Sequence, residues 1–259
     1  MTAPVDTYVV TGSASGIGAA VRARLEAAGA RVVGVDLHDA DIEVDLASAG
    51  GRHSMVDGVA ELVGEELAGV VACAGIAAPE PLTVRLNYFG AVATLEGLRP
   101  RLAAAGRSRA VAVASQAARH GDAALVDACR RGDEDRAAAE ADQLANTGAG
   151  HQIYPSSKQA LARWVRHHAA TADWAGAGIA LNAVAPGVIA TPMTQPLLDD
   201  PTMRGVVERA VPMPLSGIGT PDQIASLIAW LVGPENRLVT GQVVFADGGA
   251  DALDHPDSW

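Results

Sequence analysis

The sequence predicts an α/β fold, a single doubly wound parallel sheet with helices on both faces. Predicted strands alternate with predicted helices along nearly the whole chain of 259 residues, which is typical of consecutive βα units. The apolar residues are mostly Ala, Val and Leu, and only 3% are aromatic, which suits buried parallel strands under small-residue helices. No internal repeat or Gly-, Ser- or Pro-rich linker divides the chain, so we expect one domain over residues 1–259.

The first third of the chain contains the clearest of these units. An apolar strand at residues 8–10 leads through a glycine-rich turn into a helix that ends near Gly29, and residues 31–36 form the next buried strand. A third strand is expected at residues 42–45. The remaining predicted elements alternate between helix and strand, over residues 54–66, 70–73, 84–102, 110–114, 154–174, 179–184, 221–232 and 243–245. This order predicts a Rossmann-like sheet.

Composition excludes several classes of protein. Hydrophobic residues make up 49% of the chain and charged residues 19%, which disfavours disorder. The net charge of −11 disfavours nucleic acid and anionic membrane as partners. Cys73 and Cys129 offer neither a disulfide framework nor metal-ligand spacing, and no secretory signal or membrane-spanning run is seen. We therefore expect a cytoplasmic protein without a metal ion.

Three glycines follow the first strand in the pattern Gly-x-x-x-Gly-x-Gly, at Gly12, Gly16 and Gly18. Glycines there allow a tight turn and a close approach of pyrophosphate to the free N–H groups of the next helix. Asp36 ends the second strand, where a carboxylate can accept hydrogen bonds from both ribose hydroxyls of adenosine and repel a 2′-phosphate. The two features predict NAD(H) rather than NADP(H). The alternatives are a purely structural loop and an exposed strand-end carboxylate.

Tyr154 and Lys158 are four residues apart, so on a helix their side chains share one face. A neighbouring ammonium favours phenolate over phenol, and we therefore expect the pKa of Tyr154 to lie below its free value of roughly 10. Such a tyrosine can exchange protons near neutral pH. Taken alone, the pair is equally compatible with two surface side chains.

These motifs occur together with Cys73-Ala74-Gly75, Asn87, Ser115, Pro186-Gly187 and Asp247-Gly248-Gly249. In this order the sequence resembles the short-chain dehydrogenase/reductase family, from Tyr8 to Gly249. It departs from many members in having Cys73 where they have Asn, and Pro155 after the tyrosine. We expect Cys73 to be a small buried residue rather than a reactive thiol.

The resemblance implies a role for each matched residue. Tyr154 would be the general acid/base, and Lys158 would lower its pKa and hold the nicotinamide ribose. Ser115 would polarise the substrate oxygen, and Asn87 would help hold a water that links Lys158 to solvent. The cofactor contacts implied are Gly12, Ser15, Gly16, Ile17, Gly18, Asp36, Leu37, Asp45, Leu46, Cys73, Ala74, Gly75, Tyr154, Lys158, Pro186, Gly187, Ile189 and Thr191.

Ser115 and Tyr154 are 39 positions apart, about three times the separation found in most members of the family. The extra segment, about residues 119–150, predicts a helical hairpin packed over the site. Bacterial 3α-hydroxysteroid dehydrogenase/carbonyl reductases have an insertion here and are similar elsewhere. This resemblance implies a steroid or other bulky hydrophobic substrate. It also implies a homo-oligomer, with a dimer through residues 221–245 favoured over a tetramer because the hairpin blocks the usual pairing.

Residues 191–215 are rich in Pro, Met and Leu, and the family resemblance implies a mobile lid over the substrate. The expected activity is the NAD-dependent interconversion of a secondary alcohol and a ketone. Smaller alcohols, cyclic ketones and terpenoids are alternative substrates. A non-catalytic NAD-binding regulator is an alternative from another class, although it has no need of Ser115, Tyr154 and Lys158 together. A lyase of the halohydrin dehalogenase type predicts Arg in place of Lys158, which the sequence does not have.

Overall fold

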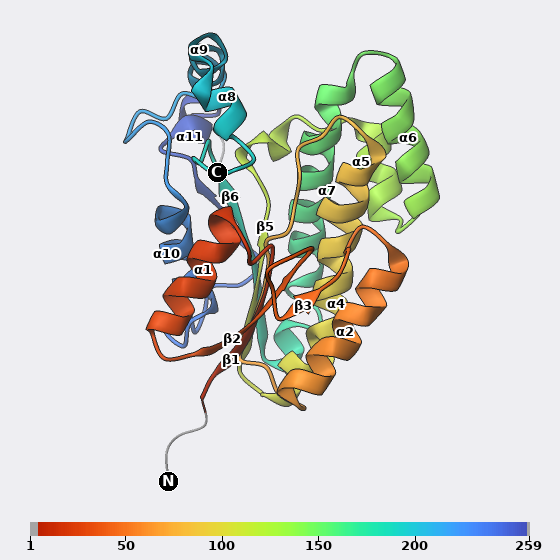
Figure 1. Cartoon of the computed structure of the whole chain (residues 1–259), viewed down its shortest axis with the longest axis vertical. Helices are drawn as coiled ribbons and strands as arrows, with labels where there is room; N and C mark the ends of the chain where they lie inside the picture. The colour runs from red at the N-terminus through yellow and green to blue at the C-terminus, as the bar shows by residue number, and fades with distance from the viewer. Residues whose placement is uncertain (1–4, 258–259) are drawn as a thin grey trace.

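The computed structural model describes residues 5–257, and within them seven parallel strands form one sheet in the order β3-β2-β1-β4-β5-β6-β7 (Figure 1). The order reverses between β1 and β4, the place where ligands bind in open α/β sheets. The α/β class and doubly wound topology are therefore confirmed. The strands are β1 (Thr7–Thr11), β2 (Arg31–Asp36), β3 (Ile42–Glu43), β4 (Gly69–Ala72), β5 (Ser108–Val113), β6 (Ile179–Pro186) and β7 (Val243–Ala246).

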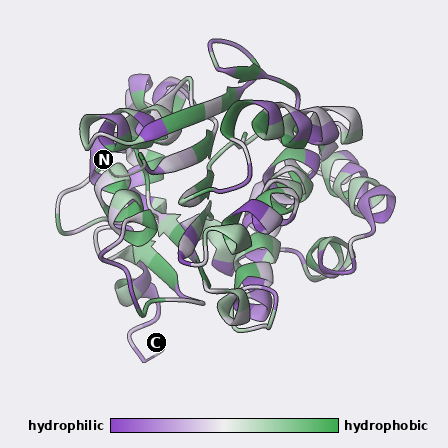
Figure 2. Ribbon diagram, turned by 90° about the horizontal axis from the view of Figure 1, so that it is seen from below, coloured by the Kyte–Doolittle hydropathy of each residue, from purple (hydrophilic) through white to green (hydrophobic). Residues whose placement is uncertain are grey.

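The central strands are buried on both faces, as their Val- and Ala-rich sequences predict. In β1, Val10 pairs with Gly34 on one side and Val71 on the other, and all three are buried. Figure 2 shows the apolar residues concentrated along the strands. Two separate apolar cores result, one on each face of the sheet.

Helices cover both faces of the sheet (Figure 1). One face carries α1 (Gly16–Ala27) and α10 (Pro221–Val232), which pack against each other. The other carries α2 (Ala49–Val63), α4 (Ala91–Ala104) and α7 (Ile153–His168). Within residues 5–257, none of the helices is both long and apolar enough to cross a lipid bilayer.

Several boundaries differ from those that the sequence predicts. α2 begins five residues early because the Ser48 side chain caps it, accepting a hydrogen bond from Gly51 N at 3.0 Å. The predicted helix at residues 84–102 consists of α3 (Pro81–Val84), a π-helical turn (Arg85–Gly90) and α4. The predicted helix at 154–174 ends at His168. The short helix α11 (Ala250–Asp254) has no counterpart in the prediction.

The extra segment before Tyr154 forms the helical hairpin that the sequence predicts, α5 (Ala123–Arg130) and α6 (Glu134–Asn146). Asp122 and Asp133 cap the two helices by accepting hydrogen bonds from the first-turn backbone, at 2.9 and 3.0 Å. Leu125 and Cys129 of α5 are fully buried, and they belong to the same apolar core as α7. The hairpin is therefore an integral part of this face of the molecule.

Candidate active site

A cavity of about 450 Å³ opens at the carboxyl ends of the strands, above the point where the strand order reverses. The first turn of α1 borders it on one side, and α7 on the other. Every residue that the sequence predicts as a cofactor contact lines this cavity. The structure therefore brings together segments as far apart in sequence as Gly12 and Thr191.

The glycine-rich turn fits closely against its neighbours. Gly12 has φ of +70°, and a Cβ built on it would lie 2.9 Å from the backbone N of Ala74. A Cβ on Gly18 would lie 2.0 Å from the carbonyl oxygen of Gly12, so a larger residue fits at neither position. The helix α1 begins at Gly16, and its first turn lines the cavity. This is a cradle shaped for a phosphate group at a helix N-terminus.

The Asp36 carboxylate is held in place at the carboxyl end of β2. Its two oxygens accept hydrogen bonds from the backbone N of Ala14 at 2.9 Å and of Leu37 at 2.7 Å. A carboxylate oxygen accepts more than one hydrogen bond. Since Asp36 also lines the cavity, it can accept further bonds from a diol such as the adenosine ribose, so the residues present fit a dinucleotide.

Three polar side chains lie together at the other end of the cavity. Ser115 lies two residues beyond the end of β5, and its hydroxyl lies within hydrogen-bonding reach of the Tyr154 phenol. Tyr154 belongs to the first turn of α7, and Lys158 follows one turn later. The Lys158 ammonium lies 5.9 Å from the centre of the Tyr154 ring and donates a hydrogen bond to the carbonyl of Val113 at 2.8 Å. A phenol, a hydroxyl and an ammonium group therefore lie close together.

The electrostatics of this group differ from the sequence-based expectation. Burial raises the pKa of Tyr154 above its ordinary value, and the hydrogen bond with Ser115, which lowers that pKa, is the smaller effect. Burial also lowers the pKa of Lys158 to about 8. The prediction of a lowered tyrosine pKa is therefore wrong for the protein as the structure describes it. Burial in a medium of low dielectric disfavours the charged phenolate, so Tyr154 is held in its protonated, donor form.

Asn87 lies behind the cavity wall rather than in it. Its side chain is fully buried, donates to the carbonyl of Ile76 at 2.9 Å and to the hydroxyl of Ser157 at 3.2 Å, and accepts from Ile76 N at 2.9 Å. A Cβ on Gly75 would come within 3.0 Å of its Oδ1. Asn87 therefore fixes the segment after β4 against α7, which supports the site without contacting its interior.

Cys73, which many family members replace with Asn, also lines the cavity. Burial raises the pKa of its thiol to about 12, although nearby Lys158 opposes the change. The thiol therefore stays protonated at neutral pH and is a poor nucleophile, as the sequence predicts, although Cys73 is only partly buried rather than fully buried as expected.

Sequence reasoning missed several residues that line the same cavity. Most are close neighbours of motif residues, so proximity to a motif is the signal that could have identified them. They are Val44, Ile76, Ala77, Leu86, Val113 and Ala114, and the cavity is also lined by Pro192, Met193 and Thr194 from the segment predicted as a lid. Among them, Thr194 is fixed by donating a hydrogen bond to the carbonyl of Ile189 at 2.5 Å.

The hairpin of α5 and α6 does not cover the cavity. It packs against α7 and α3, and in the described part of the chain no residue between 116 and 153 lines the cavity. The expectation that it is packed over the site is therefore wrong. Its apolar side chains pack against the outer surface of these helices. The spacing of apolar residues predicts an apolar helix face but does not specify which surface that face packs against.

The segment after β6 forms α8 (Gln195–Asp199) and α9 (Pro201–Ala210), which pack on each other above the sheet and away from the hairpin (Figure 1). Leu197, Met203 and Val206 on these helices are 40%, 39% and 44% exposed. Pro192 and Met193, just before them, line the cavity. The segment therefore borders the cavity mouth and leaves apolar side chains uncovered.

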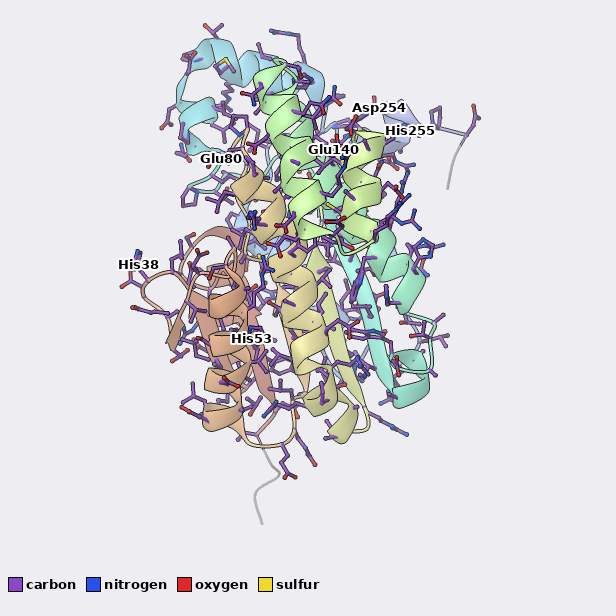
Figure 3. All side chains as sticks on the ribbon, turned by 90° about the vertical axis from the view of Figure 1, so that its right-hand side faces the viewer. His38, His53, Glu80, Glu140, Asp254 and His255 are labelled. Atoms are coloured by element: carbon purple, nitrogen blue, oxygen red, sulfur yellow. The ribbon has the colours of Figure 1, made fainter. Side chains whose placement is uncertain are left out.

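Histidine and acidic side chains do not gather into a metal site among residues 5–257. Figure 3 shows His38, His53 and His255 well separated from one another. The titratable side chains that line the cavity in this part of the chain are Asp36, Asp45, Cys73, Tyr154 and Lys158, and none of them is a histidine.

Comparison with known proteins identifies the family. A family model described as enoyl-(acyl carrier protein) reductase matches residues 139–251. The chain is 36% identical over 254 residues to the 3-alpha-hydroxysteroid dehydrogenase/carbonyl reductase of Comamonas testosteroni, covering 96% of this chain and 97% of the relative. This relative belongs to the group of enzymes that the sequence resembles, the bacterial 3α-hydroxysteroid dehydrogenase/carbonyl reductases. The predicted resemblance is therefore confirmed.

Solved structures agree. The 3-alpha-hydroxysteroid dehydrogenase of Pseudomonas sp. B-0831, complexed with NADH, has a TM-score of 0.90 and 40% identity, with 98% of this chain and 100% of that chain covered. Levodione reductase, at 23% identity, shares the fold with a TM-score of 0.76 and coverage of 95% and 98%. Because similarity in sequence and structure extends over nearly the full length of both chains, the protein belongs to the short-chain dehydrogenase/reductase family of oxidoreductases.

Proposed function

We propose that the protein is an NAD-dependent oxidoreductase that interconverts a secondary alcohol and a ketone. The observation that carries this proposal is the meeting of Ser115, Tyr154 and Lys158 at one end of a cavity whose other end holds the glycine turn and Asp36. A dinucleotide that spans the cavity would bring its nicotinamide ring close to the three side chains. When bound, it would supply the hydride acceptor or donor.

Tyr154 performs the proton transfer that must accompany hydride transfer. In ketone reduction its phenol donates a proton to the carbonyl oxygen, which becomes the hydroxyl of the product. Ser115 donates a hydrogen bond to the same oxygen and stabilises the negative charge that develops there. In alcohol oxidation the proton passes from the hydroxyl to the Tyr154 phenolate, and the positive charge of Lys158 favours that anion.

The cofactor contacts follow from the same geometry. The glycine turn and the first turn of α1 would hold the pyrophosphate, and Asp36 the adenosine ribose. Asp45 and Leu46 would flank the adenine, and Pro186, Ile189 and Thr191 would hold the nicotinamide and its carboxamide. The negative charge of Asp36 disfavours a 2′-phosphate, which supports NAD over NADP. The structural relative in complex with NADH supports the same choice.

We propose a bulky hydrophobic alcohol or ketone, of steroid-like size, as the substrate. The exposed apolar side chains of α8 and α9 border the cavity mouth and could close on such a molecule, which would exclude water from the reaction. The 3-alpha-hydroxysteroid dehydrogenases of Comamonas testosteroni and Pseudomonas sp. B-0831, to which this chain is similar, support the same substrate class. Smaller alcohols, cyclic ketones and terpenoids are the alternatives that a substrate panel would separate.

We propose a homodimer formed through α10 and β7. β7 is an edge strand of the sheet, and its residues are only half-buried in the single protomer. Trp230 on α10 is 42% exposed. The opposite face is unsuited to pairing through α4 and α7, because the hairpin of α5 and α6 projects beside these helices.

Replacing Tyr154 with Phe removes the proton donor and keeps the ring. We expect kcat for the best alcohol to fall roughly 10²- to 10⁴-fold, while the Kd for NADH stays within about twofold. Steady-state kinetics and fluorescence titration measure the two effects. Tyr8→Phe, which removes a hydroxyl from β1, is the control and should keep full activity. Full turnover by the Tyr154→Phe variant would contradict the mechanism, and turnover by neither variant nor the wild type would favour a non-catalytic regulator.

Replacing Asp36 with Asn removes the charge and keeps the shape of the side chain. We expect kcat/KM for NADP to rise about tenfold and that for NAD to fall, because the repulsion of the 2′-phosphate is lost. Asp39→Asn is the control. It changes the net charge by the same amount on the exposed loop after β2, and it should alter kcat/KM for neither NAD nor NADP. A wild-type enzyme that uses NADP better than NAD would show that Asp36 does not have this role.

The raised pKa of Tyr154 sets the sign of the pH dependence. Oxidation needs the phenolate and the phenol is protonated at neutral pH, so kcat/KM for the alcohol should rise between about pH 6 and pH 8, the range in which Lys158, with its pKa of about 8, keeps its charge. Reduction uses the protonated form and should change little over the same interval. Initial rates in both directions test this, and a plateau of the oxidation rate already at about pH 7 would mean that the tyrosine pKa is lowered instead.

A further inference from the structure

Arg52, on α2, joins three segments that are distant in sequence. Its Nε donates a hydrogen bond to the carbonyl of Leu46 at 2.9 Å, and its Nη2 donates to the carbonyl of Ala47 at 2.9 Å and to that of Arg85 at 3.2 Å. Nη1 donates to one oxygen of the Glu134 carboxylate at 2.7 Å, and Nη2 also donates to the other at 2.9 Å, so that Nη2 is shared among three acceptors. The planar guanidinium therefore binds all three segments at once.

One of these acceptors, the carbonyl of Leu46, belongs to a residue in the wall of the cavity, and Ala47 follows it directly in the chain. Leu46 lines it together with Asp45, at the end that is proposed to hold adenosine. The Asp45 carboxylate itself accepts a hydrogen bond from Ala47 N at 2.9 Å, so the segment is a compact turn. Arg52 binds this turn through the carbonyl oxygens of two consecutive residues, Leu46 and Ala47. These two hydrogen bonds fix the orientation of the turn, and with it the direction in which Leu46 faces the cavity.

Glu134 supplies the counter-charge, and it comes from the hairpin. It is the first residue of α6, and its carboxylate also forms an ion pair with Arg85 at 3.0 Å. The side chains of Arg52 and Glu134 are only 11% and 24% exposed. Hydrogen bonding from Arg52 lowers the pKa of Glu134, so the carboxylate is charged at neutral pH. Removal of that charge would leave a largely buried guanidinium without its counter-ion.

We infer that Glu134 is a positioning residue for the cofactor, and that the hairpin acts through Arg52 to hold residues 45–47 in the shape that binds the adenosine half of the dinucleotide. The inference rests on the proposed function in one respect, that this cavity binds NAD. It gives the hairpin a role in cofactor binding although the hairpin lies outside the cavity.

The geometry also predicts that the effect is selective. Ser115, Tyr154 and Lys158 are held by β5 and α7, and Lys158 is anchored on the carbonyl of Val113. Within residues 5–257, the hydrogen bonds of Arg52 go to Leu46, Ala47, Arg85 and Glu134 and to none of these three side chains. Loss of Glu134 should therefore weaken binding of the adenosine half and spare the nicotinamide half.

The test is calorimetric titration of the full-length Glu134→Gln variant with each half of the cofactor, ADP-ribose and reduced nicotinamide mononucleotide. We expect the Kd for ADP-ribose to rise about tenfold and that for the mononucleotide to stay within about twofold. Asp135→Asn removes the same charge from the same first turn of α6, where Asp135 is exposed, and should change neither value. Glu134→Asp, which keeps the charge, should recover part of the ADP-ribose affinity.

The inference is overturned if Glu134→Gln leaves the affinity for ADP-ribose unchanged, if it weakens both halves equally, or if Asp135→Asn matches it. Arg52→Lys is the second variant should Glu134→Gln not fold, because lysine keeps the charge but cannot bind two carbonyls and a bidentate carboxylate together. It should show the same selective loss. Binding needs no turnover, so a wild type that binds ADP-ribose but oxidises no alcohol would refute the proposed reaction alone. A wild type that does not bind ADP-ribose would refute the cofactor site and this inference with it.

Discussion

Close contact between the ends of β1 and β4 is the constraint on which the rest of the site depends. Gly12 lies against the backbone of Ala74 with no room for a Cβ, and Thr11 Oγ1 accepts hydrogen bonds from the backbone N of Cys73 and of Ala74 at 3.1 Å. One residue further, a Cβ on Gly75 would lie 3.3 Å from Lys158 Nζ. A line of small residues thus connects the phosphate cradle to the catalytic lysine, so the spacing between cofactor and proton donor is set by backbone contacts rather than by flexible side chains.

Much of the fold and site could be predicted because the signals are local. Strands buried on both faces appear as short apolar runs, and Gly12, Gly16 and Gly18 are required by a backbone geometry that other residues cannot adopt. Side-chain environment is not local. The spacing of Tyr154 and Lys158 predicts their shared face, but the direction in which the tyrosine pKa shifts depends on its burial in the folded chain and could not be inferred from that spacing. The position of the hairpin of α5 and α6 likewise depends on which apolar surface it packs against, and the sequence of the hairpin does not specify that surface.

The features of the site that could not be predicted from the sequence have buried charges in common. Lys158 and Arg52 are both largely removed from water, and each is retained by carbonyl oxygens of a strand end or turn next to the cavity. Such charges are costly unless they are well bonded, so their partners define local structure strongly. Lys158 fixes the catalytic end of the cavity in this way. Arg52, with Glu134 as its counter-ion, fixes the opposite end, and this gives an insertion that is remote from the cavity a physical connection to it.

The central claim is that one cavity holds both the hydride carrier and the proton donor for a single alcohol carbon. The most direct measurement is mass spectrometry of the reduced nicotinamide that forms when the protein oxidises an alcohol carrying deuterium on its carbinol carbon. The account predicts that one deuterium appears on the nicotinamide ring for each ketone formed, in ordinary water. Ketone formation with no deuterium on the cofactor would contradict it, because the hydrogen would then have reached solvent instead of passing directly between carbon atoms.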